Sequence, residues 1–216
     1  MVAGVTKKYL VMDMDGTLYP ERKEIPVSAA LASRLYDYTD RIGIPEDDVR
    51  RLVGRYVRES RITPSIDLVC GKYALDREEV AEYVFDVYPS RFGIRKDKKL
   101  LSLLLELKTS NKLTLFTNSP RIWADRVVGA LGLGGVFDRS NTIYYETLDR
   151  GASTKPRERA FQILMKRTTA DKDRLVLLDD DLWNVRMAKL MGIHALRVSD
   201  RKRDIYTVLG GLLKRP

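Results

Sequence analysis

Three short apolar segments with a common layout constrain the fold of this chain more than any other feature. Each opens with a cation and closes with Asp or Thr: KYLVMD at Lys8–Asp13, KLTLFT at Lys112–Thr117 and RLVLLD at Arg174–Asp179. Apolar runs of this length, bounded by polar residues, are typical of strands buried on both faces of a parallel sheet. Thr142–Tyr145 and Ile193–Val198 have the composition of further strands.

Helical patterns alternate with these strands. We expect helices at Arg121–Leu131, Pro156–Thr168, Leu182–Met191 and, on the surface, Arg203–Leu213. Gly132 and Gly192 follow two of them, where glycine suits the left-handed residue after a helix, and Pro156 suits a first helical position. The alternation predicts an α/β fold with a doubly wound, mainly parallel sheet. In such a sheet the strands' carboxyl ends meet at one edge, where ligands bind.

The long segment between the first and second strands has little strand pattern and exceeds the length of one crossover. Its apolar residues recur at helical intervals in four stretches: Val27–Arg41, Glu46–Ser60, Ser65–Ala74 and Arg77–Tyr88. We interpret residues 21–93 as a small helical cap domain inserted after the first strand, over the ligand edge of the sheet. Residues 1–20 and 94–216 would then form the core domain.

Composition sets the class of protein. With 44% apolar residues the chain can fill a core, and its single cysteine, Cys70, excludes an internal disulfide and a cysteine-based zinc site. We expect Cys70 to be buried. Because there is no secretory leader pattern and no apolar run near the roughly 20 residues of a membrane span, we expect a cytoplasmic protein without a membrane partner.

The chain is basic, with 39 Lys and Arg against 30 Asp and Glu, a net charge of +9. Such a charge attracts nucleic acid, anionic lipid or small phosphorylated molecules. The cations are spread along the chain without a dense tail, which favours a small phosphorylated substrate over nucleic acid. The oligomeric state has no signature in the sequence.

Acidic residues follow two of the predicted strands. Asp13-Met14-Asp15-Gly16-Thr17 leaves the first strand, and Asp179-Asp180-Asp181 closes another. Carboxylates crowded at one edge repel one another unless a cation neutralises them, and oxygen ligands without His or Cys indicate Mg²⁺. Taken alone, the first motif could be a turn with helix-capping acids.

Phosphate-binding groups are expected at the same edge. Thr117 and Asn118 follow the second strand, and Lys155 precedes a predicted helix N-terminus, which favours anions. Each signal is weak by itself, because Thr-Asn-Ser is a common capping run and most lysines lie on the surface.

In this order the motifs resemble the haloacid dehalogenase (HAD) superfamily, whose phosphatases carry DxDGT, a Thr or Ser, a Lys and an acidic pair on a Rossmann-like core. The resemblance runs from Lys8 to about Val198. DMDGTLY and DDDLWNVRMAKLMGI look most like the branch containing pyrimidine 5′-nucleotidases, although Asp181 stands where that branch has Ser. Segment 21–93 also lacks the tyrosine-rich pattern of those nucleotidases.

The resemblance implies a role for each motif residue. Asp13 would be the nucleophile and Asp15 the general acid and base, with Mg²⁺ held by Asp13, Asp179, Asp180 and the backbone carbonyl of Asp15. The phosphate oxygens would be held by three residues: Thr117, Asn118 and Lys155. Haloacid dehalogenases of the superfamily lack the second acid of the first motif, so Asp15 favours phosphate chemistry.

These expectations define a Mg²⁺-dependent phosphatase that acts on a small phosphorylated metabolite, with nucleoside monophosphates as first candidates, through an aspartyl-phosphate. A sugar-phosphate phosphomutase with the same residues, and a non-catalytic RNA- or protein-binding member of the fold, remain alternatives. Tyr19, Arg55 and Arg58 are candidate substrate contacts, although the two arginines equally fit a solvated face. His194 and Trp183 are expected to be structural.

Overall fold

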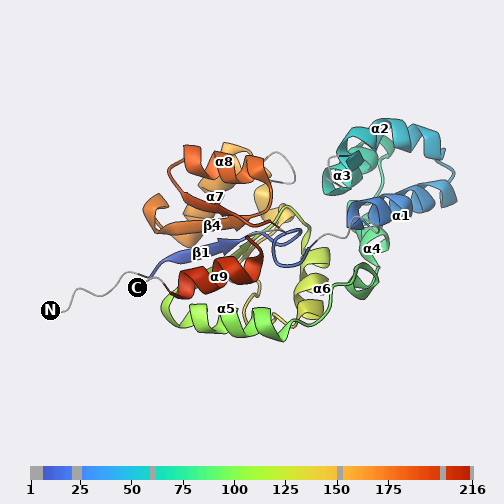
Figure 1. The fold of residues 1–216 in the computed structure, drawn as a ribbon. Helices are drawn as coiled ribbons and strands as arrows, with labels where there is room; N and C mark the ends of the chain where they lie inside the picture. Colours follow the sequence, from blue (N-terminus) through green and yellow to red (C-terminus); the bar gives the residue numbers. More distant parts are fainter. Residues whose placement is uncertain (1–6, 21–25, 59–61, 150–152, 200–202, 215–216) are drawn as a thin grey trace.

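A computed structural model of the chain describes residues 7–20, 26–58, 62–149, 153–199 and 203–214. Its strands form one parallel sheet in the order β3-β2-β1-β4-β5 (Figure 1). The strands are β1 (Tyr9–Met12), β2 (Lys112–Phe116), β3 (Thr142–Ile143), β4 (Leu175–Asp179) and β5 (His194–Arg197). The predicted α/β fold with a parallel, Rossmann-like sheet is therefore confirmed.

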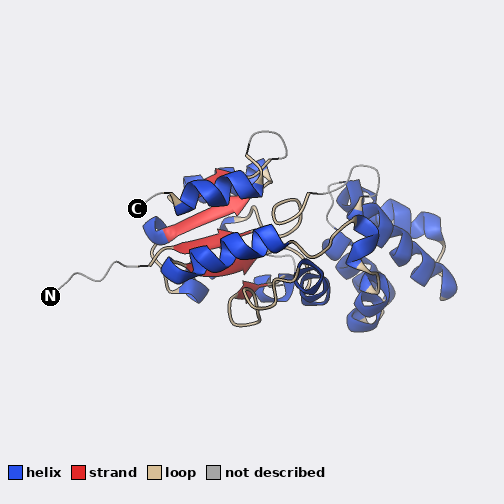
Figure 2. Cartoon of the chain, turned by 60° about the horizontal axis from the view of Figure 1, so that its bottom comes forward, coloured by secondary structure: helices blue, strands red, loops and turns tan. Residues whose placement is uncertain are grey.

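Helices cover both faces of the sheet, as Figure 2 shows. Leu10 and Met12 of β1 share a buried cluster with α5 (Lys98–Ser110), α6 (Arg121–Leu131) and α9 (Ile205–Leu213). The alternate residues Tyr9 and Val11 belong to a second cluster with α7 (Glu158–Thr168) and α8 (Leu182–Leu190). Because successive side chains of a strand point to opposite faces, one short apolar strand contributes to both cores.

Four helices between β1 and β2 pack on one another beyond the carboxyl ends of the strands (Figure 1). They are α1 (Val27–Arg41), α2 (Glu46–Arg58), α3 (Ile62–Tyr73) and α4 (Arg77–Phe85). Their shared interior includes Leu35, Val53, Ile66 and Val80, all fully buried. These side chains belong to the same buried cluster as Leu10 and Met12 of β1, so the four helices pack continuously with one face of the sheet.

A polar contact joins these helices to the sheet domain. Asp67 of α3 accepts a hydrogen bond from the phenol of Tyr145, and Nε of Arg77 lies 2.6 Å from its other oxygen. Tyr145 begins one of three short 3-10 helices, which lie at Pro89–Phe92, Tyr145–Leu148 and Lys172–Arg174. The side chain of Tyr145 is fully buried.

Several element boundaries differ from the sequence predictions. Helix α5 was not among the predicted helices, although its leucines Leu100, Leu104 and Leu107 are buried. Helix α7 begins at Glu158, because Lys155 and Pro156 form a turn before it. Helix α9 begins at Ile205 after the capping residue Asp204. Cys70 is buried, as predicted, and burial raises the pKa of its thiol to about 11.

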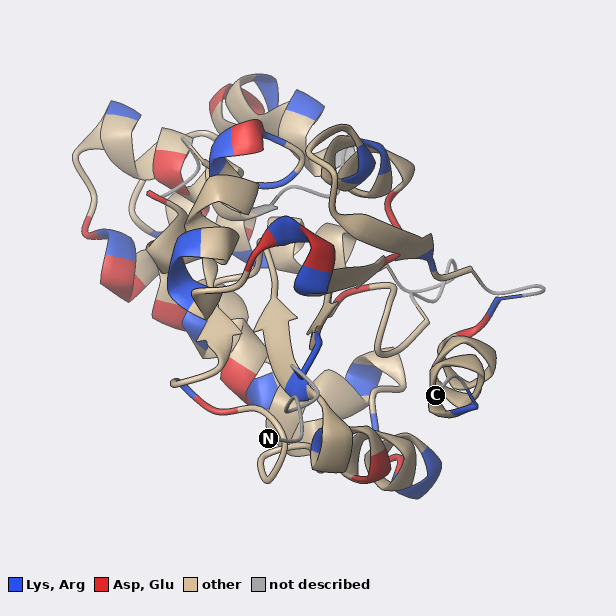
Figure 3. Cartoon of the chain, turned by 90° about the vertical axis from the view of Figure 1, so that its left-hand side faces the viewer, with Lys and Arg blue, Asp and Glu red and all other residues tan. Residues whose placement is uncertain are grey.

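Charged residues are distributed over many elements of the fold. Figure 3 shows Lys and Arg over several helices and loops, interleaved with Asp and Glu, rather than gathered in one stripe. No helix within the described ranges is both long enough and apolar enough to cross a membrane.

Candidate active site

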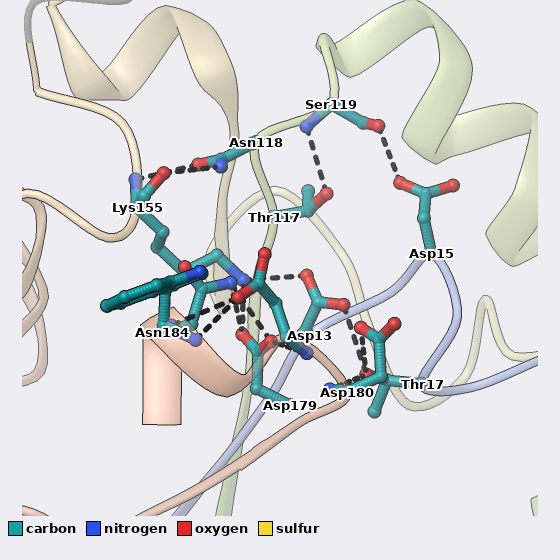
Figure 4. Close-up of polar contacts among 12 residues, drawn as sticks. Asp13, Asp15, Thr17, Thr117, Asn118, Ser119, Lys155, Asp179, Asp180 and Asn184 are labelled. Atoms are coloured by element: carbon teal, nitrogen blue, oxygen red, sulfur yellow. Dashed lines mark hydrogen bonds and ion pairs between the residues drawn. The ribbon is translucent and has the colours of Figure 1, made fainter. Parts of the chain in front are cut away.

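The residues that follow β1, β2 and β4 meet at one edge of the sheet (Figure 4). In the parallel register Met12 pairs with both Leu115 and Leu178, so the neighbouring strands end almost level. Oxygen atoms of Asp13, Asp179 and Asp180 consequently lie within 4.8 Å of one another. Residues far apart in the sequence therefore form one carboxylate cluster, as predicted.

Lys155 reaches this cluster from the turn before α7. Its Nζ lies 2.6 Å from Oδ1 of Asp13 and 2.8 Å from Oδ2 of Asp179, and its side chain is 1% exposed. The ammonium also lies 4.9 Å from the ring centroid of Phe116. Although burial would lower the pKa of Lys155, the two carboxylates raise it above its usual value, so this side chain is a cation.

Three carboxylates lie beside the Lys155 ammonium, which contacts two of them. Burial raises the pKa of Asp13, as do Asp179 and Asp180, while Lys155 opposes the shift. Burial, followed by the nearby Asp179, raises the pKa of Asp180 to about 6. The negative charge of the cluster is therefore unfavourable without a further cation, and its donors are all oxygens, a combination that fits a hard divalent cation such as Mg²⁺.

The Asp179 carboxylate accepts from three donor groups. Oδ1 accepts from the Asp181 amide at 3.0 Å, and Oδ2 accepts from Lys155 at 2.8 Å. Nδ2 of Asn184 lies 3.0 Å from Oδ1 and 3.1 Å from Oδ2, so this nitrogen is shared between the two oxygens. Because a carboxylate offers about four acceptor sites, Asp179 can orient Lys155 and the following turn and still offer an oxygen lone pair to a metal ion.

Gly16 and Thr17 bring the first and last motifs together. The Thr17 hydroxyl lies 3.1 Å from Oδ2 of Asp13 and 3.3 Å from Oδ1 of Asp180, and it accepts from the Asp180 amide at 3.0 Å. Gly16 has a φ of +79°, and a Cβ there would lie 2.4 Å from Oδ2 of Asp180. Glycine suits this position for two reasons: it adopts a positive φ without strain, and it has no side chain to collide with Asp180.

Asp181, whose role the sequence left open, caps α8. Its carboxylate accepts from the backbone amides of Trp183, at 2.6 Å, and Asn184, at 3.4 Å. A serine hydroxyl accepts such bonds equally well at this position. Asp181, in place of the serine of the family pattern, therefore still caps α8.

Asp15 occupies a different environment from Asp13. Its Oδ2 accepts from the Ser119 hydroxyl at 2.6 Å, and its Oδ1 accepts from the indole Nε1 of Trp123 at 3.1 Å. The phenol of Tyr19 also donates to Oδ1. Sequence reasoning had not identified Trp123 as a site residue.

Asn118 departs from its expected role. Its Nδ2 donates to the carbonyl of Lys155 and its Oδ1 accepts from the amide of Lys155, both at 3.0 Å. Its side chain thus fixes the backbone that carries Lys155, and because Asn118 also lines the cavity, its role in holding phosphate oxygens stays a prediction. Thr117 is fully buried and its Oγ1 accepts from the Ser119 amide at 3.0 Å.

A cavity of about 210 Å³ opens over these groups. Asp13, Asp15, Thr117, Lys155 and Asp180 line its polar end. The opposite wall comes from helices α1, α3 and α4, through Val27, Ser28, Leu31, Thr63, Pro64 and Phe85. The described part of this wall is uncharged.

A family model for haloacid dehalogenase-like hydrolases matches residues 7–192. The chain belongs to this hydrolase family. Phosphate metabolism protein 8 of Saccharomyces cerevisiae (strain ATCC 204508 / S288c) is 28% identical to it over 195 residues. That alignment covers 87% of this chain and 60% of the yeast protein, so the chain spans about three fifths of its relative's length.

Solved structures of the HAD family share its fold. A HAD family enzyme from Bacteroides thetaiotaomicron, in complex with magnesium and inorganic phosphate, is 17% identical with a TM-score of 0.56, covering 91% of this chain and 96% of that one. L-2-haloacid dehalogenase from Xanthobacter autotrophicus, with chloropropionic acid covalently bound, is 16% identical with a TM-score of 0.51, covering 96% and 88%. At this identity the likeness concerns the fold.

Arg55, His194 and Trp183 of this HAD-like hydrolase are not among the described residues that line the cavity. Arg55 is exposed on α2 and is not among the residues that line it, and the side chain of Arg58 lies outside the described part. His194 is exposed on β5. Trp183 is 63% exposed, with the guanidinium of Arg186 at 5.1 Å from its ring. Tyr19, by contrast, lines the cavity.

Proposed function

We propose that this chain is a Mg²⁺-dependent phosphatase that hydrolyses a small phosphomonoester through an aspartyl-phosphate on Asp13. The observation that carries the proposal is the second carboxylate, Asp15, which lines the same cavity as Asp13 but has its own set of hydrogen-bond donors. Two carboxylates in separate environments suit a nucleophile and a proton carrier. Release of a halide would need no such proton.

Each carboxylate has a defined part in this reaction. An oxygen of Asp13 attacks phosphorus while the bond from phosphorus to the leaving oxygen breaks, and Asp15 gives its proton to that oxygen. Asp15 then takes a proton from water as the water attacks phosphorus, which breaks the bond to Asp13 and releases phosphate. Lys155, 2.6 Å from Asp13, offsets negative charge beside the transferring group.

The carboxylate cluster fits a magnesium ion. Asp13, Asp179 and Asp180 would hold it, together with the backbone carbonyl of Asp15 that the family resemblance implies, and Asp179 would also orient Lys155. Bound magnesium would cancel the repulsion between the Asp13 carboxylate and a phosphate dianion.

The comparisons support phosphate chemistry over dehalogenation. The yeast relative is named for phosphate metabolism, and the Bacteroides enzyme was solved with magnesium and inorganic phosphate. Dehalogenases share the fold as well, so the fold alone does not choose between the two reactions. Asp15 and its donors favour the phosphatase.

Residues 21–93 would act as a cap that selects the substrate over a core made of residues 1–20 and 94–216. Support comes from helices α1, α3 and α4, which supply the uncharged wall of the cavity. A cavity of about 210 Å³ favours a small phosphomonoester, for which nucleoside monophosphates remain the first candidates.

Hydrolysis of 4-nitrophenyl phosphate with Mg²⁺, and with EDTA in its place, tests the assignment. We expect magnesium-dependent turnover that Asp13→Asn abolishes and that Asp171→Asn, at an exposed position, leaves unchanged. Turnover by the Asp13 variant, or halide release from a 2-haloacid by the wild type without phosphatase activity, would overturn the proposal. A sugar phosphate that is isomerised, with no phosphate released, would identify a mutase instead.

A further inference from the structure

Trp123 is fixed at the junction between the sheet domain and helix α4. Its side chain is 1% exposed. Its ring packs edge-on against Phe92, with 5.9 Å between ring centroids, and in a tilted arrangement against Phe85 of α4, with 6.3 Å between centroids. This packing leaves the indole little freedom to rotate. Its Nε1 points at Oδ1 of Asp15, 3.1 Å away.

Three donors hold the Asp15 carboxylate, and the indole is the rigid one. Oδ1 accepts from Nε1 of Trp123 and from the phenol of Tyr19, and Oδ2 accepts from the Ser119 hydroxyl at 2.6 Å. The two hydroxyl groups can donate or accept and can rotate about their C–O bonds. An indole N–H can only donate, and the packed ring fixes its direction, so it holds the carboxyl group in one orientation.

We infer that Trp123 is a positioning residue that holds the carboxyl group of Asp15 in the orientation needed for proton transfer. The inference rests on the proposed role of Asp15 as general acid. In the first step the bond from phosphorus to the leaving oxygen breaks, its electron pair goes to that oxygen, and a proton from Asp15 follows. Without the indole N–H the carboxyl group can rotate away from that orientation.

This role predicts a dependence on the leaving group. An alkoxide is a poor leaving group and needs the proton, whereas 4-nitrophenolate is stable at neutral pH and departs without it. A residue that only supports the fold would affect both classes of substrate equally. Loss of Trp123 should therefore slow alkyl phosphates selectively.

Trp123→Phe keeps an aromatic ring but removes the donor, and Trp183→Phe is the matched control at the exposed tryptophan. We expect Trp123→Phe to lower kcat/KM for an alkyl phosphate at least tenfold, a loss of about 1.4 kcal/mol in transition-state stabilisation. The same variant should lower kcat/KM for 4-nitrophenyl phosphate less than threefold. The control should leave both values unchanged. Equal losses on both substrates, or no loss on either, would overturn the inference, and an inactive wild type would instead sink the proposed function.

A second measurement does not depend on the folding of the Trp123 variant. The chain has 2 tryptophans, so Trp183→Phe leaves Trp123 as the sole indole fluorophore. In that background Asp15→Ala removes the hydrogen-bond acceptor and should shift the emission, whereas Asp171→Ala should not. Identical spectra for the Asp15 variant and its parent would contradict the contact.

Discussion

A methyl group on Gly16 would lie 2.4 Å from Oδ2 of Asp180. Gly16→Ala should therefore displace the Asp180 carboxylate as well as strain a backbone with φ of +79°. We expect the unfolding free energy to fall by about 1–2 kcal/mol from the backbone term. Displacement of Asp180 should also weaken Mg²⁺ binding at least tenfold, measurable by titration calorimetry.

Gly43 is a matched control for that experiment. It has a φ of +80°, but a Cβ there would meet nothing within 4 Å. Gly43→Ala should lose similar stability while keeping its magnesium affinity. If both variants bound Mg²⁺ like the wild type, the assignment of Asp180 as a ligand would be wrong.

Asp179 and Asp180 are neighbours in the sequence, yet their substitution should have opposite effects on the metal-free protein. Asp179→Asn removes a partner of the buried Lys155 ammonium, and breaking such a pair typically costs about 3–5 kcal/mol of stability. Asp180→Asn relieves carboxylate repulsion, so stability should hold or rise while stabilisation by Mg²⁺ disappears. Thermal and urea unfolding, each with and without Mg²⁺, measure both effects. The assignment fails if the two variants behave alike.

The pKa of Asp180, raised to about 6, makes magnesium binding depend on pH. Below this value a proton occupies the carboxylate and competes with the metal. Magnesium affinity should fall by up to tenfold per pH unit as the pH drops below about 6, in calorimetric titrations. The same affinity at pH 5 and pH 7.5 would contradict the raised pKa.

The same shift affects the stability of the metal-free protein. Between about pH 4 and pH 6 the folded state holds a proton on Asp180 that the unfolded state has released. The unfolding free energy should therefore decrease as the pH rises through this window and level off above it. Asp180→Asn should remove that part of the slope, which urea unfolding at successive pH values would detect.

The sheet and its site edge could be predicted because both depend on local patterns. Buried parallel strands are apolar throughout, and polar residues at their ends mark the functional edge, which placed Asp13, Thr117 and Asp179 together. Helix α6 was bounded correctly because Gly132, with φ of +75°, ends it. Helix α5 was missed, although its buried leucines recur at helical spacing.

Side-chain partners could not be predicted, because they depend on how elements pack. The sequence drew attention to Trp183, beside the acidic triplet, yet this side chain is exposed, and the tryptophan at the site is Trp123. Nothing local indicates that α6 turns Trp123 toward Asp15. The pairing of Asn118 with the Lys155 backbone likewise joins two segments whose approach only the fold determines.

The contact between Tyr145 and Asp67 offers a test of how the α1–α4 helices are held on the sheet domain. Tyr145→Phe keeps the ring and removes the phenol that donates to Asp67. We expect a loss of about 1–3 kcal/mol, since a partly buried carboxylate loses a donor. Amide hydrogen exchange of α3 should accelerate relative to β1. Unchanged exchange in α3 would show that this contact contributes little.

The most direct test of the account is whether Asp13 becomes phosphorylated during turnover. Wild-type protein quenched in acid during turnover of 4-nitrophenyl phosphate with Mg²⁺ should carry the added mass of one phosphoryl group. Borohydride reduction of the acyl phosphate should then convert residue 13 to homoserine. The account predicts this label at Asp13 and its absence in Asp13→Asn. A phosphoryl group on any other residue, or labelling that persists in the variant, would contradict it.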